Sequence, residues 1–332
     1  MSEIADVVRV GAVDCGTNSI RLLVADVSRS GRLTDVVREM EVVRLGYGVD
    51  RTGRIDPAAM ERTLTQARAY GSQCRELSAA GVRFVATSAS RDASNAGEFV
   101  SGVRAAFSDN GFDVAPEVVT GSEEAALSFD GATGDLRAAG IEGPYLVVDL
   151  GGGSTEFVRG TVDGDRVEAA LSVDIGCVRM TERHLHSDPP SPDEIAGAIA
   201  DIDAAIEQAR VAVGFAGVRS LVGLAGTVTT VTAQVLGLPA YDAERLHLST
   251  TTPEQTHDAA AALLAMTRAQ RAALPFMHPG RVDVIGAGAL IWDCIVARVA
   301  RDTGRGDALP VVTSEHDILD GIALSVARRL VS

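Results

Sequence analysis

The chain has 332 residues, of which 46% are hydrophobic and 23% charged, as expected for a soluble globular protein of two domains. Its formal net charge of −15 argues against binding to nucleic acid or to anionic membranes, so a polyanionic ligand would require local arginines or a bound metal ion. All 30 basic residues are arginine, and the absence of lysine excludes a phosphate-loop ATPase with the G-K-[ST] motif.

The cysteines and the apolar segments predict a cytoplasmic protein. The four cysteines are far apart and form no C-x-x-C motif, which is typical of reduced thiols in a cytosolic chain. The first residues, MSEIADVVRVGAVD, lack a signal-peptide core, and the longest apolar run, AAAALLAM (259–266), is too short to span a membrane.

The first third of the chain alternates between strands and helices. Strands are expected at 7–14, 20–27, 34–45, 82–88 and 113–119, and helices at 57–80, 93–107 and 122–132. The helix from Pro57 has Asp56 as its expected N-cap. The order βββαβαβα predicts a mixed sheet flanked by helices.

The pattern then restarts near residue 145. Laid on the first strands, the second segment matches Asp149 with Asp14, Gly151 with Gly16, Ser154 with Ser19, and IG (175–176) with LG (45–46). Helices then follow at 178–186, 192–213, from 227, 253–266, 279–301 and 316–330, with strands at 220–226 and 309–314. This long-period repeat predicts two copies of one fold. Domain I is expected to cover 1–125, joined by the closing helix 316–332, and domain II to cover 126–315.

Both Asp-x-Gly turns lie between two strands, which argues against a dinucleotide-binding turn that opens a helix. In such a turn, successive backbone N–H groups can bind an anion, and Ser19, Ser154 and Thr155 can add hydroxyl donors. One glycine turn in a hairpin is more often structural. Two at equivalent points of a duplicated fold predict a phosphate clamped between the domains.

A third glycine turn, GLAGTVTT (223–230), follows an apolar strand and precedes a helix. Two interpretations remain open for it. Thr227 can be the N-cap of an ordinary strand-to-helix turn, or the helix N-terminus can contact a phosphate chain.

The three turns, in DCGTNSIRLLVAD, DLGGGSTEF and GLAGTVTT, resemble the two phosphate motifs and the adenosine motif of the superfamily of actin, sugar kinases and heat-shock chaperones. Four further segments are similar to the exopolyphosphatase/guanosine pentaphosphate phosphohydrolase family: ATSASRDASN (86–95), VVTGSEEA (118–125), DIGCVRMTERHL (174–185) and SEHDILDGIAL (314–324). The resemblance spans nearly the whole chain but lacks the C-terminal helical extension of long members. It implies an α/β fold of two tandem ribonuclease H-like, actin-like ATPase domains, with mixed sheets flanked by helices and the active site in the interdomain cleft.

The resemblance also implies catalytic and phosphate-binding residues. Glu124 matches the catalytic base that positions the attacking water, and Arg91, expected in a loop, matches the arginine beside the terminal phosphate. From the residues alone, Glu124 would instead complement a helix dipole and Arg91 would be an ordinary surface arginine. The implied phosphate-binding residues are Gly16, Thr17, Asn18, Ser19, Gly151, Gly152, Gly153, Ser154, Thr155, Gly226 and Thr227.

Two carboxylates bracket the second glycine turn and suit Mg²⁺ or another divalent cation. The resemblance supports Asp149 and Glu156 as metal ligands, with Asp14 as a third contributor. Without it, Glu156 could equally be a partly solvated strand residue. The six histidines show no ligand spacing, and the dipeptide at 316–317 is interpreted as a structural part of a helix. Arg179 is a weaker anion-binding candidate, and three further arginines are expected to be solvated helix charges: Arg268, Arg271 and Arg281.

These assignments predict an exopolyphosphatase that hydrolyses terminal phosphates of inorganic polyphosphate with Mg²⁺. Hydrolysis of the 5′-phosphate of guanosine pentaphosphate, which would link the chain to the stringent response, is the alternative within the family. A sensor that binds ATP, ADP or guanosine alarmones with little turnover is a further alternative. The residues leave open whether the protein is a homodimer.

Overall fold

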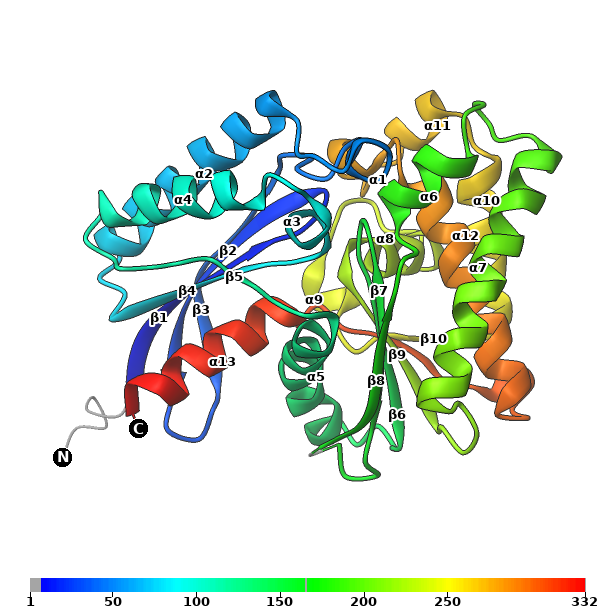
Figure 1. Ribbon diagram of the computed structural model, residues 1–332. Helices are drawn as coiled ribbons and strands as arrows, with labels where there is room; N and C mark the ends of the chain where they lie inside the picture. Colours follow the sequence, from blue (N-terminus) through cyan, green and yellow to red (C-terminus); the bar gives the residue numbers. More distant parts are fainter. Residues whose placement is uncertain (1–6, 165, 332) are drawn as a thin grey trace. The chain divides into compact units, whose positions relative to one another are not determined.

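The computed structural model describes residues 7–164 and 166–331, and these form two compact units (Figure 1). The first unit ends at Gly131 and resumes at Ile318, and the second runs from Ala132 to Asp317. The chain therefore passes between the units inside helix α5 (Gly121–Ala138), a few residues after the expected boundary at 125. Among the described residues, no helix is long and apolar enough to cross a membrane.

The first unit is built on a mixed sheet with the strand order β3-β2-β1-β4-β5. Its strands are β1 (Val7–Cys15), β2 (Ser19–Ser28), β3 (Leu33–Val42), β4 (Gly81–Ala86) and β5 (Glu117–Val118). The first three form antiparallel hairpins, and β4 and β5 add in parallel. The expected strand 113–119 shortens to two residues, and Pro116, which has no N–H to donate, directly precedes it.

Helices cover both faces of this sheet because residues of β1 alternate between two apolar cores. Val13 and Cys15 pack on the face covered by α2 and α4, whereas Val10 and Ala12 pack against α13 (Figure 1). The helices of the unit are α1 (Val49–Thr52), α2 (Pro57–Glu76), α3 (Ser88–Asp92), α4 (Ala96–Ser108), the start of α5, and α13 (Ile318–Val331). Asp56 caps α2 as expected, accepting hydrogen bonds from two backbone N–H groups.

The second unit repeats the opening hairpins in a sheet with the order β10-β11-β9-β6-β7-β8. Its strands are β6 (Tyr145–Leu150), β7 (Thr155–Gly160), β8 (Val167–Val173), β9 (Ser220–Leu224), β10 (Thr250–Thr251) and β11 (Val311–Thr313). The expected α/β class with two mixed sheets flanked by helices is therefore confirmed.

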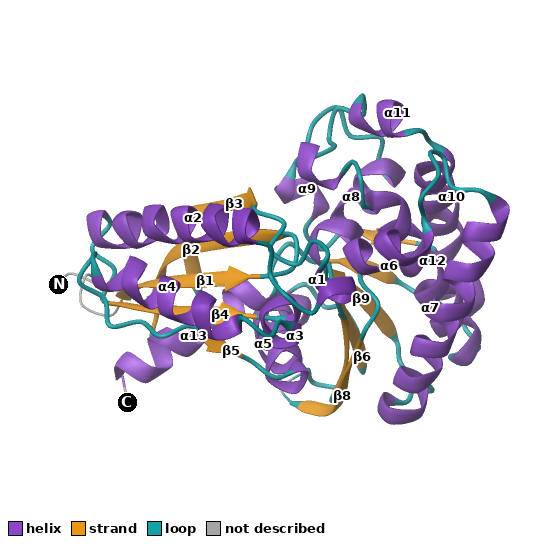
Figure 2. Ribbon diagram, turned by 45° about the horizontal axis from the view of Figure 1, so that its top comes forward, coloured by secondary structure: helices purple, strands orange, loops and turns teal. Residues whose placement is uncertain are grey.

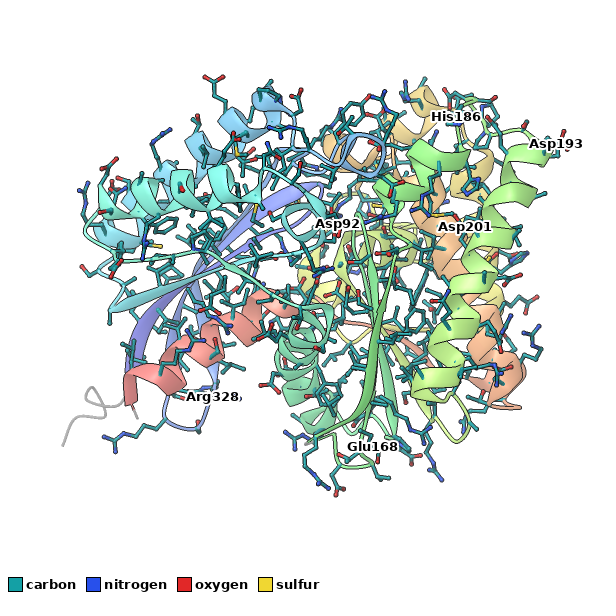
Figure 3. All side chains as sticks on the ribbon, in the orientation of Figure 1. Asp92, Glu168, His186, Asp193, Asp201 and Arg328 are labelled. Carbon is teal, nitrogen blue, oxygen red and sulfur yellow. The ribbon has the colours of Figure 1, made fainter. Side chains whose placement is uncertain are left out.

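One large apolar core joins this second sheet to a layer of helices (Figure 2). The helices that follow β8 in this unit are α6 (Cys177–His184), α7 (Pro192–Val213), α8 (Ala225–Val235), α9 (Ala243–Leu246), α10 (Pro253–Ala265), α11 (Arg268–Ala272) and α12 (Ile285–Asp302), with short 3-10 turns at Pro279–Arg281 and Gly306–Ala308; α9 contributes Leu246 to a smaller apolar cluster. Neighbouring helices also pair their exposed charges. Asp201 of α7, labelled in Figure 3, accepts hydrogen bonds from Arg183 and His184 of α6.

Candidate functional site

The two Asp-x-Gly hairpins have the same backbone geometry. In β1–β2 the Gly16 N–H donates to the Ser19 carbonyl over 2.9 Å, and in β6–β7 the Gly151 N–H donates to the Ser154 carbonyl over 3.0 Å. Their strand registers also coincide, with these cross-strand partners: Asp14 with Arg21 and Asp149 with Glu156. The internal repeat read from the sequence is thus confirmed down to individual residue pairs.

The second glycine turn packs closely on the start of α6. The N–H groups of Cys177 and Val178 donate to the carbonyls of Gly151 and Gly152, over 3.0 and 2.9 Å. A Cβ on Gly176, which corresponds to Gly46 in the first unit, would collide with the backbone of Gly152. Because the carbonyls of the turn face α6, the N–H groups of the same peptides face the opposite way, as in anion-binding turns.

Arg179 lies at this turn as well. Its Nε donates to the Gly153 carbonyl over 2.6 Å, which brings a guanidinium to the phosphate motif as expected for the weaker candidate. The Thr155 hydroxyl instead donates to the Ile175 carbonyl over 2.6 Å, and the residue is fully buried. The structure therefore gives the Thr155 hydroxyl a backbone partner, which disfavours its expected role as a phosphate donor.

Two buried carboxylates bracket the turn. Asp149 and Glu156 are 7% and 1% exposed and lie directly opposite each other on neighbouring antiparallel strands. Ser172 on β8 donates a hydrogen bond of 2.7 Å to Glu156 Oε1. Like charges in such a position destabilise a sheet unless a cation balances them. An all-oxygen pair of carboxylates is the donor set that Mg²⁺ prefers, so these residues fit the expected metal.

The first hairpin carries a different pair. Arg21 occupies the position of Glu156, and its Nη2 lies 2.7 Å from Asp14 Oδ2 in an ion pair. The Asp14 carboxylate is thus already balanced by a guanidinium. A direct metal contact by Asp14 stays a prediction, with a weaker electrostatic reason than that for Asp149.

Helix α3 connects the first turn to the expected catalytic residues. The hydroxyls of Thr17 and Ser88 lie 2.9 Å apart, which joins the turn to the start of α3. Arg91 stands in this helix and not in the expected loop, because α3 begins directly after β4. Its Nη1 donates to the Val119 carbonyl over 2.9 Å and to Glu124 Oε2 over 3.2 Å.

The two glutamates at the start of α5 have separate roles. The Glu123 carboxylate accepts a 2.9 Å hydrogen bond from the Thr120 N–H, while the Thr120 hydroxyl accepts one from the Glu123 N–H. Hydrogen bonds from the Thr120 backbone and hydroxyl lower the pKa of Glu123. Glu123 therefore completes the helix cap. Glu124, 7% exposed, faces Arg91 instead.

An arginine expected from the sequence to be solvated packs on the third glycine turn. Helix α8 begins at Ala225, so Thr227 lies in its first turn and is not the N-cap. The guanidinium of Arg281 packs directly on Gly226, where a Cβ would collide with it. Its Nη1 also donates a 3.3 Å hydrogen bond to the Thr230 hydroxyl.

Two of the three arginines expected to be solvated helix charges are instead buried or partly buried. Arg281 packs on the glycine turn, and Arg271 is 5% exposed and ion-paired with Asp188 at 3.1 Å. The expectation fits only Arg268, whose side chain is 64% exposed. The contacts of the other two join segments far apart in the chain, so a short stretch of sequence does not reveal them.

Comparisons with known proteins agree with these motifs. The family model described as "Ppx/GppA phosphatase family" matches residues 23–305. Exopolyphosphatase 2 of Mycobacterium tuberculosis is 49% identical over 322 residues, which are 96% of this chain and 98% of the relative. The guanosine-5′-triphosphate,3′-diphosphate pyrophosphatase of Aeromonas salmonicida is 34% identical over 219 residues, 65% of this chain and 42% of the relative.

A solved structure also shares the fold over nearly its whole length. The crystal structure of an exopolyphosphatase-like protein matches with a TM-score of 0.93 and 43% identity, covering 98% of this chain and all of that one.

Proposed function

The chain belongs to the Ppx/GppA phosphatase family, and from that premise we propose that it is an exopolyphosphatase that removes terminal phosphates from inorganic polyphosphate. The similarity to exopolyphosphatase 2 of Mycobacterium tuberculosis, which extends over nearly the full length of both chains, supports this substrate. The observation in the structure that carries the proposal is the pairing of Arg91 with the buried carboxylate of Glu124. Arg91 lies on α3, the helix that is bonded to the first glycine turn.

In the proposed reaction, a water molecule attacks the terminal phosphorus in line with the bridging oxygen. The new bond forms between the water oxygen and phosphorus, the bridging P–O bond breaks, and the shortened chain leaves with that oxygen. Glu124 orients the water and accepts its proton, which then passes to solvent. A buried carboxylate with a fixed position suits this role because the water must be held at one angle.

Arg91 stabilises the charge that develops on the phosphoryl oxygens. Both of its hydrogen bonds within the described part of the chain use Nη1, and a guanidinium has five N–H donors in a planar fork. The remaining donors can bind phosphate oxygens while Nη1 holds Glu124 in place. The backbone amides of the glycine turns bind further phosphate oxygens.

Asp149 and Glu156 would hold the divalent cation, which we propose to be Mg²⁺. When bound there, the cation supplies positive charge that neutralises phosphate oxygens next to the glycine turn. Ser172 keeps the Glu156 carboxylate in one orientation through its 2.7 Å hydrogen bond. With a net charge of −15, the chain needs this cation and Arg179 to attract a polyanion.

Phosphate release from long polyphosphate, short polyphosphate and guanosine pentaphosphate tests the proposal. We expect Glu124→Gln to lower kcat on polyphosphate by about two to four orders of magnitude, the usual contribution of a general base. Glu123→Gln is the matched control, because glutamine at this position preserves the helix cap, and it should retain near wild-type activity. Equal kcat values for Glu124→Gln and the wild type would contradict the assigned base.

Hydrolysis of the 5′-phosphate of guanosine pentaphosphate is the second candidate. The 34% identity with the Aeromonas salmonicida pyrophosphatase favours it, over a region that is 42% of that relative. Phosphate release from the nucleotide alone, with none from either polyphosphate, would replace the first proposal by this one.

A further inference from the structure

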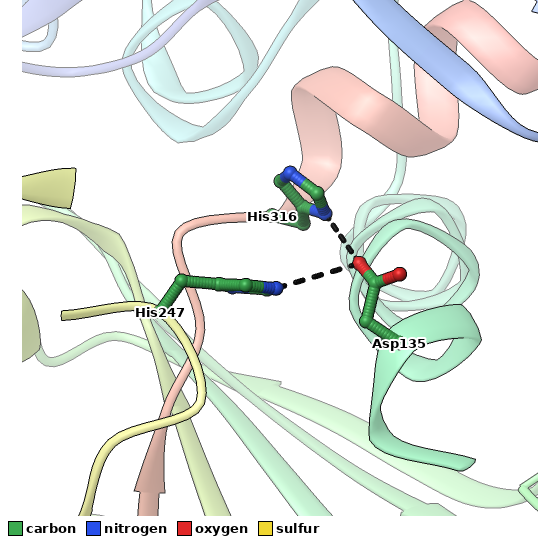
Figure 4. A group of neighbouring side chains, drawn as sticks. All are labelled: Asp135, His247 and His316. Carbon is green, nitrogen blue, oxygen red and sulfur yellow. Dashed lines mark hydrogen bonds and ion pairs between the residues drawn. The ribbon is translucent and has the colours of Figure 1, made fainter. Parts of the chain in front are cut away.

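Three potential metal ligands meet in the second unit, and none of them is a residue of a glycine turn (Figure 4). They are Asp135 near the end of α5, His247 directly after α9, and His316 two residues before α13. His316 Nδ1 lies 2.5 Å from Asp135 Oδ2, and His247 Nε2 lies 3.6 Å from the same oxygen. One ligand atom of each residue lies within 4.8 Å of the other two.

The backbone holds both histidines in place. The segment after His247 bonds to β11, with the Leu248 N–H donating to the Thr313 carbonyl over 2.8 Å. The Ser314 hydroxyl closes the next turn by accepting a 3.1 Å hydrogen bond from the His316 N–H. As a result the two imidazole rings lie only 4.5 Å apart, centroid to centroid. A cluster fixed in this way loses little conformational freedom when it binds an ion.

Two imidazoles with one carboxylate are a typical ligand set for zinc and other divalent transition metals, whereas Mg²⁺ prefers oxygen ligands alone. In a tetrahedral site with metal–ligand bonds of about 2.0–2.1 Å, neighbouring ligand atoms lie about 3.3 Å apart. The separations of 2.5 and 3.6 Å lie on either side of this value, so movements of about 1 Å suffice. The side chains are 21–44% exposed, which leaves room for a water ligand.

We propose that Asp135, His247 and His316 bind a divalent transition-metal ion, with Zn²⁺ as the probe. This site is separate from the Mg²⁺ site proposed above. Binding replaces the His316–Asp135 hydrogen bond with two bonds to the metal, and the proton of the neutral His316 imidazole moves from Nδ1 to Nε2. At His247 it moves the ring proton from Nε2 to Nδ1, at the cost of the 3.3 Å hydrogen bond from the Glu315 N–H.

The position of the site along the chain indicates what the metal would do. Asp135 lies just beyond Gly131, where the first unit ends, and His316 lies just before Ile318, where that unit resumes. Both points at which the chain passes between the units are therefore within a few residues of the cluster. A bound ion would tie these two connections together and restrict their relative motion. The bound metal is therefore expected to stabilise the fold.

Zinc titration of the metal-free full chain tests this proposal, with the bound metal counted per chain. We expect one Zn²⁺ in the wild type, with affinity at least 100-fold weaker in His247→Gln and His316→Gln. His257→Gln is the matched control, because this exposed histidine pairs with a single carboxylate, Asp293. Asp149→Asn, which removes the proposed Mg²⁺ site, should also leave zinc affinity unchanged.

Zn²⁺ should raise the unfolding temperature of the wild type and of the control, but not that of His316→Gln. In Asp135→Asn the side chain keeps nearly its original shape, so this variant replaces a histidine variant that fails to fold. The proposal is overturned if the wild type binds no Zn²⁺, if the three cluster variants bind it as tightly as the wild type, or if Asp149→Asn abolishes binding.

Discussion

The β1–β2 and β6–β7 hairpins share a backbone but carry opposite chemistry at one position. Both close their turn with a glycine N–H bonded to a serine carbonyl, and both place an aspartate at the same register. Across the strand, Asp14 faces Arg21, whereas Asp149 faces Glu156. The first pair is an ion pair, whereas the second consists of two carboxylates, which a bound cation would stabilise.

This difference shows that two copies of one backbone can carry different side-chain chemistry. Both turns keep the same backbone hydrogen bond, so that part of the repeat is alike in the two units. A single change of side-chain charge then confines the proposed metal to the second hairpin. The first unit contributes Arg91 and Glu124 instead, which have no counterparts among the paired residues of the repeat.

Removal of a carboxylate from the second hairpin should have the largest effect. We expect Glu156→Gln to lower kcat on polyphosphate about 1,000-fold, since a lost metal contact costs several kcal/mol of transition-state stabilisation. The Mg²⁺ concentration for half-maximal activity should rise as well. Glu168→Gln on the neighbouring strand β8 is the control, because Glu168 pairs with Arg159 at the surface. If Asp14→Asn raises the Mg²⁺ requirement as much as Glu156→Gln, the proposed division between the hairpins is wrong.

Removal of the arginine from the first hairpin should mainly affect stability. Arg21→Gln leaves the buried Asp14 carboxylate without its nearest cation, and breaking such a pair costs about 3 kcal/mol in the free energy of unfolding. Arg9→Gln is the matched control on the same two strands, since the Arg9–Asp26 pair is about a third exposed and should contribute much less. Urea unfolding of both variants measures how much free energy of unfolding each one loses. Equal losses for Arg21→Gln and Arg9→Gln would contradict this prediction.

The glycines that pack on the two turns allow a finer comparison. A Cβ on Gly176 would meet the backbone of Gly152, whereas a Cβ on Gly46 would meet the Thr17 side chain. Overpacking costs about 1–3 kcal/mol, and a side chain can move aside more easily than a backbone. We therefore expect Gly176→Ala to lower the free energy of unfolding by about 2 kcal/mol and Gly46→Ala by about 1 kcal/mol. The reverse order in urea unfolding would contradict this packing.

Local sequence patterns predicted the elements and the repeat well, because alternating apolar residues and glycine turns act over a few residues. The Asp14–Arg21 pair could have been found by continuing the alignment of the repeat two residues beyond Ser19. The Asp135–His247–His316 cluster could not, since its members are far apart in the chain and no ligand spacing connects them. His316 was also assigned to a helix that begins only at Ile318.

Several site residues were predicted from family motifs and not from physical pattern alone. Glu123 and Glu124 are identical neighbours in the sequence, and only the three-dimensional contacts separate the capping residue from the partner of Arg91. Arg281 was underestimated because its contact with Gly226 joins segments about 50 residues apart. Long-range packing of this kind is not encoded in any short window.

The smallest expected effect concerns the turn residue that follows each aspartate, Cys15 in the first hairpin and Leu150 in the second. Both are buried, and burial, together with the charge of Asp14, raises the pKa of the Cys15 thiol well above its ordinary value. The folded protein therefore keeps this thiol protonated while the unfolded chain ionises it above about pH 8.5. The contribution of the Cys15 thiol to the free energy of unfolding is fully present below that pH and is lost as the pH rises above it.

Cys15→Ala removes the pH-dependent contribution and leaves the other cysteines in place. We expect the variant to be less stable than the wild type at pH 7 by about 1 kcal/mol, because it leaves a small cavity. At pH 9.5 the variant should gain about 1.4 kcal/mol relative to the wild type, the linkage free energy of one thiol one pH unit above its unfolded pKa. Urea unfolding at both pH values measures this change. A gap between the two proteins that stays constant would mean that Cys15 ionises in the folded protein, and that the turn is more open to water than its burial indicates.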